Sequence, residues 1–218
     1  MSTVIFDFDS TLITLESLEE ILADQCRKQP GLEARIREIT DLGMAGSIDF
    51  QQSLSRRLQL ASPTLADVCA FGQRGIQLLT PGMRDLVSWL LDRGADVRIV
   101  SGGLREAIVP VALDLGIAAD HVHAVSLLWD ESGSFAGIDP DDPFSRSKSE
   151  GVSAWIKKTP TPRIAVGDGM TDYYLLRDGL VDHFVAFTEN VRREAVTAVS
   201  KLEARDVASL RQLLENLL

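Results

Sequence analysis

The chain has 218 residues, of which 45% are hydrophobic, and its formal net charge is −10 at pH 7. The hydrophobic content favours a large packed core over a disordered chain, and the negative charge argues against a general nucleic-acid partner. No apolar stretch approaches the roughly 20 residues that span a bilayer, and the N-terminus lacks the pattern of a secretory signal. We therefore expect a cytoplasmic protein with no membrane partner, and the sequence leaves its oligomeric state open.

Short apolar runs and helical patterns alternate along most of the chain. This alternation predicts an α/β fold with a Rossmann-like parallel sheet and helices on both of its faces. The expected strands are Thr3–Phe6, Asp96–Val100, Val122–Leu128, Arg163–Val166 and His183–Phe187. The expected helices between them are Met83–Arg93, Arg105–Leu115, Ser149–Lys157, Asp172–Arg177 and Arg192–Val199.

One long segment after the first strand breaks the alternation. All of its apolar runs have helical spacing, so we expect residues 15–80 to form a helical cap and residues 1–14 and 81–218 to form the core domain. Farther along, Ser132-Gly133 between apolar flanks predicts a β-hairpin within Ser126–Ile138. The helices expected in the cap are Leu15–Cys26, Leu32–Met44, Phe50–Leu60 and Thr64–Gln73.

Two carboxylates, Asp7 and Asp9, stand at the end of the first strand. In an extended chain, side chains two residues apart point the same way. Burying two like charges so close together is costly unless a cation or a proton lies between them. The pair therefore indicates a divalent metal and one carboxyl group that keeps its proton.

Further polar residues follow other predicted strands. Ser101 comes directly after one strand and Asp168 directly after another. Ligands of parallel sheets bind beyond the carboxyl ends of the strands, so the fold would bring both residues to Asp7. Asp168 stands between two glycines, which suits ligation of a hard cation because the backbone must turn sharply there. Asp172 could cap the next helix or orient the water shell of the metal.

Two more features suit a phosphate group. Gly102 and Gly103, beside the hydroxyl of Ser101, would let backbone N–H groups approach a phosphate oxygen. Lys148 would balance negative charge there. Each of these features alone is also typical of an ordinary turn or a solvated side chain, and only their order along the chain makes the combination specific.

In that order the motifs resemble those of the haloacid dehalogenase superfamily, whose first motif is Asp-x-Asp-x-Thr. Within it, the chain resembles the phosphoserine phosphatase family. Asp7-Phe8-Asp9-Ser10-Thr11-Leu12, Glu16, the run Met44–Phe50 and Arg57 are similar to that family's first motif and cap signature. The resemblance implies an enzyme that hydrolyses O-phospho-L-serine to L-serine and phosphate, the last step of serine biosynthesis.

The resemblance also implies a role for each residue. Asp7 would attack phosphorus and form an aspartyl-phosphate, and Asp9 would protonate the leaving oxygen and later accept a proton from water. The cofactor would be Mg²⁺, held by Asp7, the backbone carbonyl of Asp9, and Asp168. Ser101 and Lys148 would complete the catalytic set. The implied substrate-binding residues are Glu16, Met44, Gly46, Phe50, Arg57, Ser101, Gly102, Gly103, Lys148 and Thr171.

Three alternative functions remain open at this point. A phosphotransferase of the same fold would pass the phosphoryl group to another hydroxyl, such as that of homoserine. A phosphatase for another small metabolite is the second alternative, although Glu16 suits an ammonium group and Arg57 a planar carboxylate, which together favour a phosphorylated amino acid. The third is a binding module without catalysis, which the presence of Asp7, Asp9, Lys148 and Asp168 disfavours.

Overall fold

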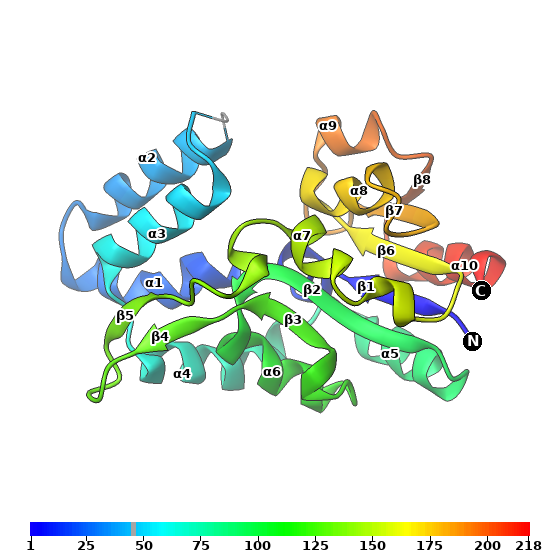
Figure 1. Cartoon of the computed structure of the whole chain (residues 1–218), viewed down its shortest axis with the longest axis horizontal. Coiled ribbons are helices and arrows are strands. Elements are labelled where there is room, and N and C mark those ends of the chain that lie inside the picture. Colours follow the sequence, from blue (N-terminus) through cyan, green and yellow to red (C-terminus); the bar gives the residue numbers. More distant parts are fainter. Residues whose placement is uncertain (45–46) are drawn as a thin grey trace.

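The computed structural model of the chain describes residues 1–44 and 47–218. Its centre is a six-stranded sheet in which every neighbouring pair of strands is parallel (Figure 1). No helix in the described residues is both long and apolar enough to cross a membrane. In spatial order the strands are β3 (Val122–Val125), β2 (Asp96–Leu104), β1 (Thr3–Phe6), β6 (Arg163–Gly167), β7 (His183–Phe187) and β8 (Leu202–Ala204).

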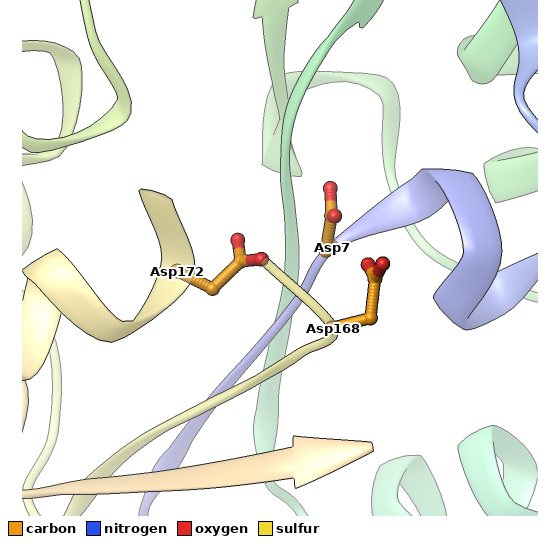
Figure 2. A group of neighbouring side chains, drawn as sticks. All are labelled: Asp7, Asp168 and Asp172. Atoms are coloured by element: carbon orange, nitrogen blue, oxygen red, sulfur yellow. The ribbon is translucent and has the colours of Figure 1, made fainter. Parts of the chain in front are cut away.

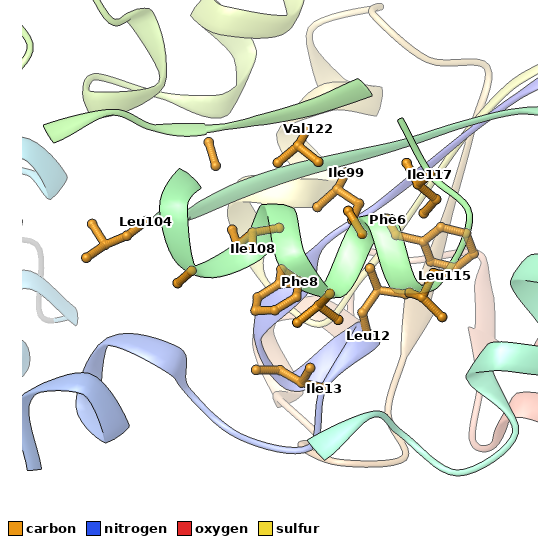
Figure 3. Packing of buried hydrophobic residues seen from close by; sticks show 14 of the residues in the cluster. Phe6, Phe8, Leu12, Ile13, Ile99, Leu104, Ile108, Leu115, Ile117 and Val122 are labelled. Atoms are coloured by element: carbon orange, nitrogen blue, oxygen red, sulfur yellow. The ribbon is translucent and has the colours of Figure 1, made fainter. Parts of the chain in front are cut away.

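Helices cover both faces of the sheet, because successive side chains of a strand point to opposite faces. In β1, Val4 and Phe6 enter one hydrophobic core and Ile5 enters the other. The larger core, part of which Figure 3 shows, is covered by α5 (Met83–Asp92), α6 (Arg105–Asp114) and α10 (Val207–Leu217). The smaller core is covered by α7 (Lys148–Ser153), α8 (Met170–Arg177) and α9 (Glu194–Thr197). The predicted fold class is confirmed.

The segment between β1 and β2 is helical, as expected. Figure 1 shows two of its helices, α2 and α3, as a pair that stands apart from the sheet. The last helix of the segment instead lies beside α6. The division into a core and a cap at residues 15–80 stays a prediction. The helices are α1 (Ser17–Lys28), α2 (Leu32–Met44), α3 (Phe50–Ala61) and α4 (Leu65–Gly75).

The structure corrects the single strand predicted at Val122–Leu128. Ser126 takes the chain out of the sheet, because its N–H donates to Asp142 Oδ2 at 2.7 Å and its carbonyl accepts from the Asp139 N–H at 3.0 Å. Of the predicted strand, only Val122–Val125, which is β3, therefore belongs to the main sheet. The following residues form β4 (Leu127–Trp129), which pairs antiparallel with β5 (Phe135–Ile138) and confirms the predicted hairpin.

Other boundaries also differ from the predictions. β2 continues past Val100 to Leu104, with an irregular register against β3 over these residues. The helix predicted at Ser149–Lys157 is shorter, ending at Ser153 before a separate turn at Ile156–Lys158. The helix predicted at Arg192–Val199 is reduced to α9. Two elements near the C-terminus, β8 and α10, were not predicted.

Gly72 lets α4 approach α6 closely. A Cβ atom at Gly72 would lie 2.9 Å from Pro110 Cγ and 3.0 Å from the backbone oxygen of Ala107. Both distances are shorter than ordinary van der Waals contacts, so any side chain at residue 72 would push the two helices apart. The contact fixes α4 on the core and thereby anchors the end of the helical segment.

Gly72→Ala is therefore expected to destabilise the protein by about 1–3 kcal/mol through overpacking. The sign of the change in the free energy of unfolding is informative, because a glycine-to-alanine substitution at an unconstrained helical position stabilises a protein by about 1 kcal/mol. Gln73→Ala, at the adjacent exposed residue, serves as the matched control and should be close to neutral. Urea unfolding measures both free energies, and a Gly72→Ala variant more stable than the wild type would contradict the close contact.

Candidate active site

The backbone turns sharply just after β1 and separates the two acids of the first motif. Residues Phe8–Leu12 form one wide turn in which Asp9 and Ser10 are not helical, and Ser10 has a left-handed φ of 52°. Asp7 Oδ1 accepts a hydrogen bond from the Phe8 N–H at 2.7 Å, whereas Asp9 Oδ1 accepts one from the Ser17 N–H at 2.8 Å. The two carboxylates thus have different partners, although they are two residues apart.

Asp7 belongs to a cluster of three buried carboxylates. Asp168 follows β6 and Asp172 lies in the first turn of α8, and Figure 2 shows the three side chains close together. One oxygen of each carboxylate lies within 4.8 Å of one oxygen of the other two. Lys148 enters from α7, and its Nζ lies 2.6 Å from Asp7 Oδ1 and 2.6 Å from Asp172 Oδ1.

The charges of this cluster are unbalanced. Burial and the nearby Asp172 raise the pKa of Asp7 well above its usual value, while Lys148 opposes them. Burial also raises the pKa of Asp168 and of Asp172. Burial alone would lower the pKa of Lys148, but Asp172 and Asp7 outweigh it and raise the pKa. Lys148 and Arg193, whose Nε lies 2.9 Å from Asp168 Oδ2, supply two positive charges against three carboxylates. The cluster could therefore hold a metal ion, which would favour the ionised forms of the carboxylates.

Gly167 is required by this cluster for a reason other than the expected sharp turn. A Cβ atom at Gly167 would lie 2.4 Å from the Asp172 carboxyl group, so only glycine leaves room for Asp172. Asp172 Oδ2 also accepts a hydrogen bond from the Gly169 N–H at 3.1 Å. Asp172 therefore fulfils the predicted capping role and pairs with Lys148 at the same time.

Asp9 lies in a different environment from Asp7. Burial, followed by the charge of Glu16, raises the pKa of Asp9 to about 7. A group that gains and loses a proton near neutral pH is suited to act first as an acid and then as a base. This raised pKa allows Asp9 to carry a proton near neutral pH.

Ser101, Gly102 and Gly103 lie in the irregular end of β2, directly before α6. Ser101 is buried, and its Oγ accepts a hydrogen bond from the Gly103 N–H at 2.9 Å. A Cβ atom at Gly102 would lie 2.9 Å from the ring of Phe50. Phe50 is the first residue of α3, so the helical segment covers this end of the sheet.

The structure places Glu16 and Arg57 near each other. Glu16 Oε1 accepts a hydrogen bond from Ser10 Oγ at 2.8 Å. Arg57 is half-buried on α3, and burial lowers its pKa, partly opposed by Glu19 and Glu16. The two charges that suit an amino acid therefore lie on the same side of the molecule as Asp9.

Three other predicted residues contribute less to this picture. Thr171 is exposed in the first turn of α8. Gly46 lies outside the described residues, as does the side chain of Met44.

Two residues that the sequence reasoning missed reach the site from beyond β7. Arg193 Nε donates to Asp168 Oδ2 at 2.9 Å, and its Nη2 lies 3.4 Å from Glu16 Oε1. Asn190 Nδ2 donates to Thr80 Oγ1 at 2.7 Å and contacts the backbone of the turn after β1. Both follow a parallel strand at its carboxyl end, which is the signal that could have found them.

Comparisons with known proteins show which family the chain resembles. A family model described as haloacid dehalogenase-like hydrolase matches residues 4–177. The chain is 36% identical to the chloroplastic phosphoserine phosphatase of Arabidopsis thaliana, over 91% of this chain and 66% of that protein. It is 35% identical to the phosphoserine phosphatase of Rattus norvegicus, over 95% and 90% of the two chains. A crystal structure of a phosphoserine phosphohydrolase-like protein from Francisella tularensis superposes with a TM-score of 0.91 at 41% identity, covering 98% of this chain and all of that one.

The contact between Arg193 and Asp168 predicts an effect on metal binding. Because the guanidinium neutralises one of the cluster's carboxylates, Arg193→Gln should bind a divalent cation more tightly, by about fivefold for an ion pair of about 1 kcal/mol. Arg192→Gln is the matched control, since Arg192 pairs with Glu203 instead. Titrating MgCl₂ while recording the melting temperature gives the Mg²⁺ affinity of each variant. Weaker binding by Arg193→Gln than by the control would contradict the prediction.

Proposed function

Because the chain belongs to the haloacid dehalogenase-like hydrolases and, within them, to the phosphoserine phosphatase family, we propose that it hydrolyses O-phospho-L-serine to L-serine and phosphate. The observation that carries this proposal is the pairing of Asp7 with Lys148 beside a second acid, Asp9, whose pKa is about 7. A nucleophile and a separate proton donor are what hydrolysis through a covalent intermediate needs.

In the first half-reaction, Asp7 attacks phosphorus. Its Oδ1 is held by Lys148 and by the Phe8 N–H, which leaves Oδ2 to form the new bond. As that bond forms, the bond from phosphorus to the seryl oxygen breaks, and Asp9 gives its proton to the departing oxygen. Ser101, the amides of Gly102 and Gly103, and Lys148 stabilise the oxygens of the transferring group.

In the second half-reaction, water attacks the aspartyl-phosphate on Asp7. Asp9, now ionised, accepts a proton from this water, and the electron pair of the broken bond returns to the Asp7 carboxylate. One residue can act as acid and then as base because the two steps are consecutive. The products are serine, inorganic phosphate and the starting enzyme.

We propose Mg²⁺ as the metal, held by Asp7, Asp168 and the backbone carbonyl of Asp9. All three ligands are oxygen atoms, which suit a hard cation. When bound, the ion supplies positive charge that reduces the repulsion between the nucleophile and the phosphate. Arg193 then has to release Asp168, which it holds at 2.9 Å in this structure.

Substrate selection is assigned to the helical segment. As the family resemblance implies, Glu16 would bind the ammonium group of phosphoserine and Arg57 its carboxylate. The rest of the substrate site would be lined by Met44, Gly46, Phe50 and Thr171. The ring of Phe50 against Gly102 supports this assignment, because it brings α3 over the phosphate-binding glycines. Residues 15–80 would act as a cap that opens for the substrate and closes to exclude stray water. The partner is thus a small phosphorylated amino acid, and a cytoplasmic location stays a prediction.

Asp7→Asn should lower the rate of phosphoserine hydrolysis by roughly a thousandfold or more, because the amide cannot serve as the nucleophile. The fold should survive, since Lys148 keeps its contact with Asp172. Phosphate release in the presence of Mg²⁺ measures the rate, and circular dichroism checks the fold. Hydrolysis at nearly the wild-type rate would refute the assignment of Asp7.

Arg57→Ala should raise KM for phosphoserine by roughly 10- to 100-fold, the size of a charged hydrogen-bonded contact. Phosphoethanolamine has the same ammonium and phosphate groups but no carboxylate, so its KM should change little. Arg56→Ala, at the adjacent exposed arginine, is the control variant. Equal increases in KM for both substrates would remove Arg57 from the carboxylate site.

A further inference from the structure

The hydroxyl group of Ser10 holds the side chain of Glu16. Ser10 lies in the turn after β1, next to the proposed proton donor Asp9, and is buried at 1% exposure. Its Oγ donates a hydrogen bond to Glu16 Oε1 at 2.8 Å. A serine hydroxyl has one proton to donate, so Ser10 gives the only proton of its side chain to Glu16. The carboxylate is thereby tied to the turn that carries Asp9.

Glu16 keeps its second carboxylate oxygen free. Arg193 Nη2 also contacts Glu16, and it lies 3.4 Å from the same atom, Oε1. Within residues 1–44 and 47–218, no donor contacts Glu16 Oε2. The Glu16 side chain is 45% exposed, so a ligand can reach it. One oxygen of Glu16 therefore fixes the carboxylate, and the other is available to a ligand.

The turn itself does not need the Ser10 hydroxyl. The Ser10 N–H donates to the Leu15 carbonyl at 3.1 Å, and the Ser10 carbonyl accepts from Asn190 Nδ2 at 3.2 Å. Any residue except proline supplies both of these backbone groups. The φ of 52° at Ser10 favours glycine, which adopts it without steric cost. Serine is therefore strained at this position, and what it adds over glycine is the hydroxyl group on Glu16.

Helix capping does not explain Glu16. It is the N-cap residue of α1, a position that Ser, Thr, Asp or Asn usually fill, and its side chain makes no capping hydrogen bond. The hydrogen bond between Ser10 and Glu16 thus orients a half-exposed carboxylate that the helix does not use. Such an arrangement suits the binding of a ligand better than the stabilisation of the fold.

We propose that Ser10 positions Glu16 for the ammonium group of the substrate, and that it thereby sets the preference for phosphorylated amino acids over phosphate esters without an ammonium group. This inference rests on the proposed function. A neutral donor suits the task because it orients the carboxylate without cancelling its charge, whereas a lysine or arginine in its place would form an ion pair with Glu16. Ser10 is thus a positioning residue that acts through Glu16.

The place of Ser10 beside Asp9 gives this contact a further consequence. In phosphoserine, two carbon atoms separate the ammonium nitrogen from the oxygen that leaves. An ammonium group held by Glu16, which Ser10 holds in turn, fixes that oxygen relative to the segment that carries Asp9. Loss of the Ser10 hydroxyl should therefore lower kcat/KM for phosphoserine beyond any general effect on catalysis.

The test compares two phosphate esters. 3-Phosphooxypropionate has the carboxylate and the phosphate of phosphoserine but no ammonium group. The selectivity ratio is kcat/KM for phosphoserine divided by kcat/KM for 3-phosphooxypropionate, both measured as phosphate release with Mg²⁺. It cancels any general loss of activity from a change beside Asp9. Ser10→Ala should lower the selectivity ratio about tenfold, the effect of one lost hydrogen bond to a charged group.

A second variant separates the hydroxyl from the shape of the turn. Ser10→Gly removes the same hydroxyl but relieves the backbone strain, so it should lower the selectivity ratio as much as Ser10→Ala and replaces it if Ser10→Ala does not fold. Thr14→Ala is the matched control. It removes a hydroxyl from the same segment, one that donates to the Leu78 carbonyl at 3.4 Å, and the selectivity ratio should not change.

A double-mutant cycle shows whether Ser10 acts through Glu16. Glu16→Gln should also lower the selectivity ratio, because it removes the charge that the ammonium group meets. Adding Ser10→Ala to Glu16→Gln should then lower the ratio little further, since the two residues belong to one interaction. Two effects that simply multiply would show that Ser10 acts independently of Glu16, which contradicts the proposal.

An unchanged selectivity ratio in both hydroxyl-free variants would overturn the proposal. So would a ratio that falls in Ser10→Ala but not in Ser10→Gly, because the shape of the turn would then explain the effect. A wild-type ratio near one would also overturn it, while phosphoserine hydrolysis itself would stand. A wild-type enzyme that releases phosphate from 3-phosphooxypropionate but not from phosphoserine would refute the proposed function instead, so the two failures are distinguishable.

Discussion

The contact on which the site depends is that of Lys148 with Asp7 and Asp172. Lys148 Nζ lies 2.6 Å from an oxygen of Asp7 and 2.6 Å from an oxygen of Asp172, and all three side chains are buried. This one ammonium joins the end of β1 to α7 and α8, so three segments far apart in the chain meet at a single charge. It still leaves the carboxylates in excess, and that excess is what suits the cluster to a divalent cation.

Two aspartates two residues apart acquire different chemistry because the backbone between and after them is irregular. Ser10, with a φ of 52°, directs the chain back so that α1 begins beside Asp9. Asp7 therefore lies in the cluster of three carboxylates and pairs with Lys148. Asp9 instead accepts a hydrogen bond from the N-terminus of α1, and burial and the charge of Glu16 raise its pKa. Strain of this kind in a non-glycine residue is typical of functional sites.

The sequence predicted the parallel sheet and the meeting of Asp7 and Asp168, because strand order and direction bring residues that follow neighbouring strands to one edge. The sequence could not predict the hydrogen-bond partners of Asp9. The prediction assumed an extended backbone from Asp7 to Asp9, whereas the chain turns directly after Asp7. Arg193 was missed because its contact with Asp168 depends on the path of the loop after β7. β8 escaped detection because it is only three residues long, and Gly167 was explained by a turn rather than by the space that Asp172 needs.

The central claim is that Asp7, held by Lys148, becomes covalently attached to phosphorus. Borohydride reduces an acyl-phosphate but not a free carboxylate, so enzyme quenched during turnover with tritiated borohydride can be digested and its labelled peptide sequenced. We expect the label at residue 7, dependent on both phosphoserine and Mg²⁺. Full turnover with the label at another residue, or with no label at all, would contradict the account.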